Sequence, residues 1–118
     1  MFLNLGHKKL QVYNISRELM KASYAVTLRL PDEEKFNLVQ QIRRASLSVK
    51  LNIAEGASRK SEVERKRFWE ISRGSVIEID AAAEAIVDLE YLPEGELEEL
   101  GRLLNSCFAL LTKMTERK

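Results

Sequence analysis

Apolar residues recur every three or four positions through the first thirty residues, as they do on one face of an α-helix. The pattern predicts a helix from about Lys8 to Leu30, whose inward stripe consists of Val12, Ile15, Leu19, Ser23, Val26 and Leu30. Pro31 ends this helix, because the residue before a proline is disfavoured in the α conformation. Asp32 is then the expected cap of a second helix, since a carboxylate oxygen can accept hydrogen bonds from free backbone N–H groups.

Three further stretches show the same helical spacing. The second helix is expected to end near Gly56, a natural C′ residue, and its stripe is Leu38, Ile42, Ala45, Val49 and Ile53. Ser61 followed by Glu64 has the pattern of a capping box and predicts the start of a third helix with the stripe Phe68, Ile71, Ser75, Ile79, Ala82, Ile86 and Leu89. After the interruption "LPEGE", a fourth helix is predicted with the stripe Leu97, Leu100, Leu104, Cys107, Leu111 and Met114.

Four helices with short connections predict an all-α fold, an antiparallel up-down-up-down four-helix bundle. The 118 residues suit a single domain, residues 1–118, with a modest core. Only two prolines and five glycines occur, which favours long helices over many short strands joined by turns. We expect one buried cluster made of Leu19, Ile42, Ile71, Ile79, Leu104 and Leu111.

Apolar residues also occur outside these stripes. Leu47 and Leu51 fall opposite the core stripe of the second helix, and Trp69 and Val76 form part of an additional strip on the third. A monomeric bundle needs one apolar stripe per helix, so the additional residues indicate a wide core or a subunit interface. We favour the interface, because apolar surface beyond the needs of the core usually marks a contact, and we predict that Leu47, Leu51, Trp69 and Val76 lie in it.

Composition changes this picture mainly through charge. The formal net charge is +1, but residues 41–75 contain nine Lys/Arg against four Glu, whereas residues 76–100 contain nine Asp/Glu and no Lys/Arg. Local fields rather than net charge steer ligands, so a near-neutral total is compatible with an anion-binding surface. Several cations are needed to bind a nucleic-acid backbone, and the candidates are Arg43, Arg44, Lys50, Arg59, Lys60 and Arg67. The alternative is a solvated helix face whose cations pair with neighbouring carboxylates.

Residues typical of enzymes and metal sites are scarce. His7 is the single histidine, and the sequence shows neither zinc-ligand spacing nor a glycine-rich phosphate loop. We therefore expect no catalytic residues, no bound metal and no cofactor. A single cysteine, Cys107, agrees with a reducing compartment, and the absence of a signal-peptide pattern and of a long apolar run indicates the cytoplasm.

Several motifs, in order, resemble the four-helix-bundle proteins encoded within 23S ribosomal RNA intervening sequences. They are "HKKLQVY" (7–13), "LPDEE" (30–34), "QIRRASLSVKLNIAEG" (41–56), "RKS" (59–61) and the spacing "ExxRFxxISxGSxxEI" (64–79). The resemblance covers about residues 7–92. It implies a non-enzymatic, ring-shaped homopentamer of bacterial origin with a nucleic-acid-binding role. A related branch, the accessory variability determinants of diversity-generating retroelements, implies a reverse transcriptase and RNA as partners.

The sequence departs from the family at Lys50 and Leu51, where relatives usually have proline and then serine. Without that proline the second helix regains an N–H donor and is expected to be straighter, and the surface gains a cation. Two functions follow as hypotheses. One is RNA or DNA binding by a homo-oligomer, and the other is a protein-interaction scaffold whose arginines bind an acidic protein partner or the next subunit.

Overall fold

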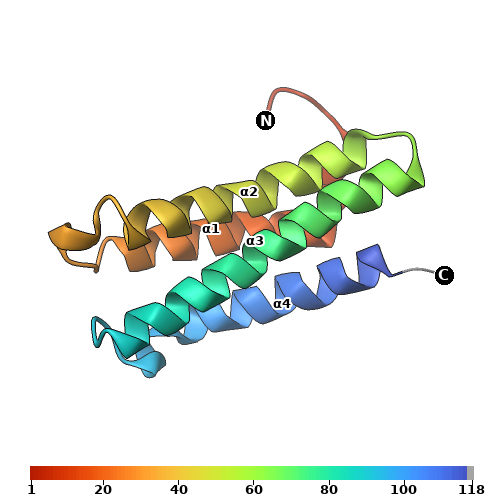
Figure 1. Ribbon diagram of the computed structural model, residues 1–118. Helices are drawn as coiled ribbons and strands as arrows, with labels where there is room; N and C mark the ends of the chain where they lie inside the picture. Colours follow the sequence, from red (N-terminus) through yellow and green to blue (C-terminus); the bar gives the residue numbers. More distant parts are fainter. Residues whose placement is uncertain (117–118) are drawn as a thin grey trace.

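The computed structural model describes residues 1–116, and four long helices dominate it. Their bounds are α1 (Gln11–Thr27), α2 (Leu38–Ser58), α3 (Glu62–Asp88) and α4 (Glu98–Thr115). Short 3-10 helices precede three of them: η1 (Gly6–Lys9), η2 (Asp32–Glu34) and η3 (Glu94–Leu97). Successive long helices run in opposite directions (Figure 1), and residues 1–116 contain no strand. The predicted all-α, up-down-up-down bundle is therefore confirmed.

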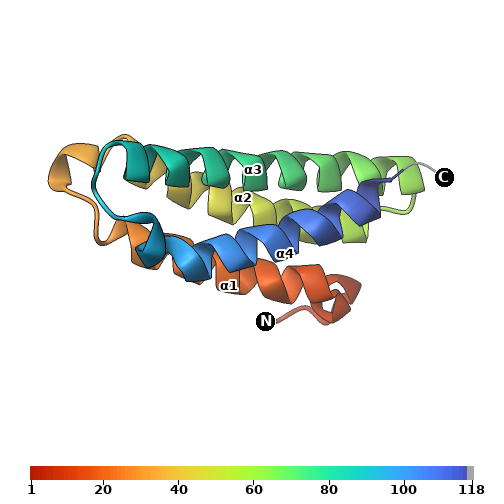
Figure 2. The same ribbon diagram turned by 90° about the horizontal axis from the view of Figure 1, so that it is seen from below.

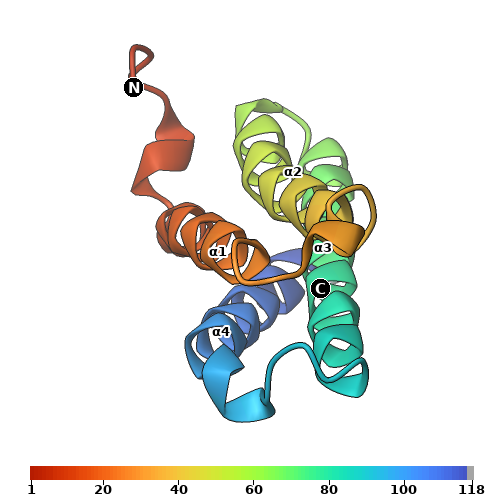
Figure 3. The ribbon, with the colours of Figure 1, turned by 90° about the vertical axis from the view of Figure 1, so that its left-hand side faces the viewer.

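The four helices stand at the corners of a square when the bundle is viewed along its length (Figure 3). Each helix packs against its neighbours in sequence, and α4 closes the bundle by packing against α1, as the view from below also shows (Figure 2). The helices α2 and α3 form one long antiparallel hairpin, joined by a turn at Arg59–Ser61 (Figure 1).

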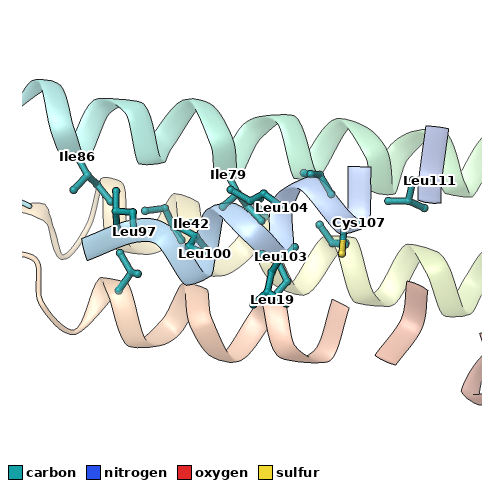
Figure 4. Close-up of a cluster of buried hydrophobic side chains, with 14 of the residues drawn as sticks. Leu19, Ile42, Ile79, Ile86, Leu97, Leu100, Leu103, Leu104, Cys107 and Leu111 are labelled. Atoms are coloured by element: carbon teal, nitrogen blue, oxygen red, sulfur yellow. The ribbon is translucent and has the colours of Figure 1, made fainter. Parts of the chain in front are cut away.

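The core runs along the axis of the bundle and is built from all four helices (Figure 4). The α4 stripe is confirmed, because every predicted residue of it is buried except Met114, which is half-buried. The α1 and α2 stripes also face inward. Side chains that are at most 1% exposed include Leu19, Ile42, Val49, Ile53, Ile79, Ile86, Cys107 and Leu111.

The third helix buries the predicted Ser75, Ile79 and Ile86, but it is rotated so that Ser72 and Val76 are also buried, whereas the predicted Leu89 is 53% exposed. Ile71 is 47% exposed and does not belong to the core, whereas Val76 is only 2% exposed and does. Small hydroxyl residues explain the rotation: Ser72 Oγ donates to the Val49 carbonyl oxygen over 2.8 Å, and Ser75 Oγ donates to Ser48 Oγ over 2.9 Å. Serines thus occupy the face of α3 toward α2, and the isoleucine turns outward.

The connection between α1 and α2 also differs from the prediction. Asp32 lies in η2 and does not cap α2, which begins six residues later at Leu38. The adjacent Glu34 takes the structural role instead: its carboxylate is buried and accepts hydrogen bonds from Asn37 Nδ2 at 3.2 Å and from the Tyr91 hydroxyl at 2.8 Å. Since Tyr91 follows α3, Glu34 joins the two loops at this end of the bundle.

At the opposite end, α2 continues past Gly56, which is therefore not a C′ residue. A Cβ atom at Gly56 would lie 2.5 Å from Trp69 Nε1, so the glycine is needed for close packing of α2 on α3. The Trp69 indole N–H donates to the Ile53 carbonyl oxygen over 3.3 Å. The Ser61 cap of α3 is confirmed, because Ser61 Oγ accepts from the Glu64 N–H at 3.2 Å.

Candidate nucleic-acid interface

The bundle is electrostatically asymmetric along its length. If each long helix is divided near its midpoint, the half that carries the α2–α3 turn comprises residues 1–18, 49–74 and 107–116, and it contains eleven Lys/Arg against six Asp/Glu. The other half, residues 19–48 and 75–106, contains six Lys/Arg against twelve Asp/Glu. We refer to these as the basic half and the acidic half. Because the helices are antiparallel, charges that are separated along the sequence are also separated in space. The resulting field favours the approach of anions to the basic half.

The α2–α3 turn is surrounded by five cations, the corner cluster: Arg59, Lys60, Arg65, Lys66 and Arg67. Two of them hold the turn in shape. Arg65 Nε donates to the Arg59 carbonyl oxygen over 2.7 Å. The Arg59 guanidinium lies 4.7 Å from the centre of the Phe68 ring and pairs with Glu55 at 3.0 Å. These arginines are structural parts of the corner as well as positive charges.

Lys60 and Arg67 are the exposed members of the corner cluster, and within residues 1–116 neither has a carboxylate within 4.0 Å. Lys66 is more constrained, because its Nζ donates to the Glu116 carbonyl oxygen over 2.9 Å and lies 3.7 Å from Glu62. Lys60 and Arg67 are therefore the corner cations best placed to contact an external phosphate.

Arg43 and Lys50 share one flank of α2, as their spacing predicts, and that flank packs on α1. Arg43 Nε donates to Thr27 Oγ1 over 2.9 Å, and its guanidinium lies 4.7 Å from the centre of the Tyr24 ring. Lys50 Nζ lies 5.3 Å from the centre of the Tyr13 ring. Both cations are half-buried, so each has an intramolecular role as well as a charge.

The six predicted cations do not form one patch. Arg43 and Arg44 precede Arg59 by about sixteen residues, which corresponds to roughly 24 Å along the axis of α2. Arg44 is exposed on the outer side of α2, in the acidic half, whereas Lys50, Arg59, Lys60 and Arg67 lie in the basic half. The structure therefore places Arg59, Lys60 and Arg67 at the turn, leaves Lys50 about 14 Å away along the axis of α2, and leaves Arg43 and Arg44 in the other half.

A group of cations that the sequence analysis missed lies beside the corner. Lys8 and Lys9 belong to η1, which packs against α1 and α2 near Lys50. The His7 ring meets the Tyr13 ring edge-on at 4.7 Å, and burial, followed by the positive charges of Lys8 and Lys50, lowers the pKa of His7. The two adjacent lysines of the "HKK" motif (7–9) are visible in the sequence, but only the fold shows that they lie in the basic half.

The four predicted interface residues divide into two pairs. Leu47 and Leu51 are 39% and 51% exposed on the outer face of α2, as expected for a contact surface. Val76 is buried within its own chain, which contradicts its assignment to a subunit interface. Trp69 is half-buried against Gly56, so its main contact is also intramolecular. Spacing alone does not show which residues of the strip are covered by the α2–α3 packing, and the surface assignment of Val76 was therefore wrong.

Residues 1–116 contain no group of three or more His, Cys, Asp or Glu arranged to hold a metal ion. In the same residues, every helix is too short or too polar to cross a membrane.

Comparisons with known proteins agree with this architecture. Residues 8–113 match the family described as 23S rRNA-intervening sequence protein. A comparison with curated proteins found no match. A solved protein of unknown function from the S23 ribosomal protein family of Bacteroides thetaiotaomicron VPI-5482 is similar in fold, with a TM-score of 0.81 and 21% sequence identity over 90% of this chain and 99% of that one. Because the family match spans most of the sequence, the chain belongs to the family of 23S rRNA-intervening sequence proteins.

Proposed function

We propose that this protein is a non-enzymatic homo-oligomer, a pentameric ring by its family resemblance, that binds RNA through phosphate contacts of its basic half. The observation that carries the proposal is the lengthwise separation of charge: eleven Lys/Arg against six Asp/Glu at one end of a bundle whose net charge is +1. A polyanion gains affinity from each phosphate that a cation neutralises, because condensed counterions are released.

The exposed cations suit backbone contacts. Arg67 can present two parallel N–H donors to one phosphate, whereas Lys60 acts as a point charge. Phosphate contacts fix position and orientation but carry little sequence information. Binding is therefore expected to be weakly specific and to fall steeply as salt concentration rises.

The decisive experiment compares two double variants with the same change in charge. Lys60→Ala/Arg67→Ala, the corner variant, removes two exposed cations from the basic half, and Lys21→Ala/Lys35→Ala removes two exposed cations from the acidic half. Fluorescence anisotropy with a labelled ribosomal RNA fragment is measured over a series of salt concentrations. The corner variant should weaken binding to all RNA sequences alike. It should also reduce the slope of log K against log salt by about 1.4 to 1.8, because each phosphate that is no longer neutralised lowers the slope by about 0.7 to 0.9.

The acidic-half variant serves as the control for net charge. If both variants weaken binding equally, affinity follows overall charge and the basic half is not the interface. If the parent protein does not bind RNA or DNA even at low salt, the proposal fails.

A specific surface favours a second candidate, the protein-interaction scaffold. A groove of about 260 Å³ on the outer side of α2 combines apolar and cationic side chains, among them Tyr24, Phe36, Leu47, Arg43 and Arg44. Phe36 is 81% exposed, and such a surface suits an acidic, apolar protein segment, for example on a reverse transcriptase. Phe36→Ser/Leu47→Ser should abolish binding to that partner and leave RNA binding unchanged, whereas the corner variant should do the reverse.

A further inference from the structure

A groove between α3 and α4 in the acidic half has a charge pattern that no nucleic acid would match. Its volume is about 450 Å³, and its apolar part is formed by Ala83, Val87, Leu97 and Leu100. Five exposed carboxylates surround it: Asp80, Glu84, Asp88, Glu94 and Glu98. Within the described residues none of the five pairs with a cation, so the negative charge around the groove is uncompensated. A suitable occupant is apolar and positively charged.

The N-terminal arm of this chain, residues 1–9, has that composition. Phe2, Leu3 and Leu5 are 90%, 66% and 46% exposed, so the arm presents three large apolar side chains to solvent. Lys8 and Lys9 follow directly in η1. The arm therefore offers apolar side chains for the base of the groove and two cations for its acidic rim.

The arm cannot reach the groove of its own chain. It joins the bundle through η1, which packs on α1 and α2, and in the end-on view it lies on the opposite flank from α3 and α4 (Figure 3). The groove is also in the acidic half, whereas the arm starts from the basic half. Five extended residues span at most about 18 Å, which is too short to cross from one flank and one end to the other.

We propose that the N-terminal arm of one copy occupies the α3–α4 groove of a second copy of this chain. The contact is heterologous, since arm and groove are different surfaces, and such contacts generate rings when the rotation between copies closes. Carboxylates and lysines from the two copies would neutralise each other, and the exposed apolar residues of the arm would leave water. The inference rests on the homo-oligomeric part of the proposed function and adds the contact that makes it.

Cysteine cross-linking between two different variants tests this contact directly. One partner carries Leu3→Cys in the arm, and the other carries Gly101→Cys together with a mass tag. Gly101 lines the groove, and a Cβ there meets no atom within 4 Å, so the substitution is accommodated. Mild oxidation of the mixture should give the mixed disulfide as the main product. Cys107 is buried and does not compete.

The matched control replaces Gly101→Cys by Gly74→Cys. Gly74 is an exposed helical glycine of α3 whose Cβ position is equally open, but it does not line the groove. We expect a yield at least tenfold lower with this control. Equal yields from the two glycine positions would overturn the inference, because they would show random collision.

Charge reversal tests whether the yield of the same mixed disulfide depends on the charges of the two surfaces. Lys8→Glu/Lys9→Glu in the arm partner should reduce the mixed disulfide about tenfold, and Glu84→Lys/Glu98→Lys in the groove partner should restore it. If no reversal changes the yield, the charge complementarity has no role and the inference fails. Light scattering of the parent chain separates this from the proposed function: an oligomer without the cross-link refutes the arm contact alone, and a monomer refutes both.

Discussion

Substitution of Gly56 by alanine should destabilise the protein, although alanine is the better helix former. A Cβ at this position would lie 2.5 Å from Trp69 Nε1 and 2.7 Å from Trp69 Cδ1, and 3.0 Å from the backbone carbonyl oxygen of Arg65. Favourable contacts between such atoms occur at about 3.5 to 4 Å, so the indole ring must withdraw by roughly 1 Å. The carbonyl belongs to the backbone of α3, which means that rotation of the indole ring alone cannot relieve the overlap.

The expected magnitude follows from three terms. Overpacking typically costs about 1 to 3 kcal/mol. Displacement of the indole from the Ile53 carbonyl oxygen removes a hydrogen bond that contributes about 0.5 to 1.5 kcal/mol. Replacement of a helical glycine by alanine returns about 1 kcal/mol. We therefore expect Gly56→Ala to lower the free energy of unfolding by about 1 to 3 kcal/mol.

Urea unfolding followed by circular dichroism measures this change, and Gly74→Ala is the matched control. Gly74 lies within α3 and a Cβ there meets nothing within 4 Å, so alanine should stabilise the protein by about 0.5 to 1 kcal/mol. The key expectation is that the two Gly→Ala substitutions change the free energy of unfolding in opposite directions. In a Trp69→Ala background the part of the cost of Gly56→Ala that comes from the indole should disappear, and the part that comes from the Arg65 carbonyl oxygen should remain. A neutral or stabilising effect of Gly56→Ala in the parent protein would refute the reasoning.

Three further predictions concern the core and the acidic end. Ile79→Ala should lower the free energy of unfolding by about 2 to 5 kcal/mol in the same urea assay, since the side chain is fully buried, and a loss below about 1 kcal/mol would contradict its place in the core. The hydrogen bond that Tyr91 donates to Glu34, with a smaller contribution from burial, raises the pKa of Tyr91 to about 12. In an unfolded chain the tyrosine pKa is about 10. The stabilisation that comes from the Tyr91–Glu34 hydrogen bond is therefore full below about pH 10 and is lost as the pH rises from about 10 to 12. The difference in free energy of unfolding between the parent protein and Tyr91→Phe should shrink over that window. Burial raises the pKa of the Cys107 thiol to about 12. A thiol reagent at about pH 8 should therefore label Cys107 only after the protein is unfolded in urea. Rapid labelling of the native protein would show instead that the thiol is accessible.

The helices and most of the core could be predicted from sequence, because Leu, Ile and Val repeat at helical spacing in α1, α2 and α4. The rotation of α3 could not, since Ser72 lies on its face toward α2, where the hydroxyl donates to the Val49 carbonyl oxygen. Hydrophobicity alone places Ile71 inward instead. The role of Gly56 was missed for a similar reason: a glycine near a helix end predicts a stop, and only the neighbouring indole shows that it is needed for packing.

The positive charge of the candidate site could be predicted from the sequence, but the positions of its residues relative to one another could not. The run of Lys and Arg in the sequence identified the corner. Lys8 and Lys9 add to the positive charge of that end because α1 runs antiparallel to α2, which places the start of α1 in the basic half. Spacing placed Arg43 and Lys50 on one flank correctly, but it could not show that α1, with Tyr24 and Tyr13, covers that flank.

The separation of charge also has a consequence for how the molecule would stand on a polyanion. The bundle measures 44 × 33 × 21 Å, and its carboxylate-rich half would be repelled by the same phosphates that attract the other end. Each copy would therefore stand upright on the nucleic acid instead of lying along it. At about 3.4 Å of helix axis per base pair of B-form duplex, the end of the bundle covers about six to ten base pairs, against about thirteen for a bundle lying lengthwise. Upright copies could stand close together along a strand, each with its carboxylate-rich end held away from the phosphates.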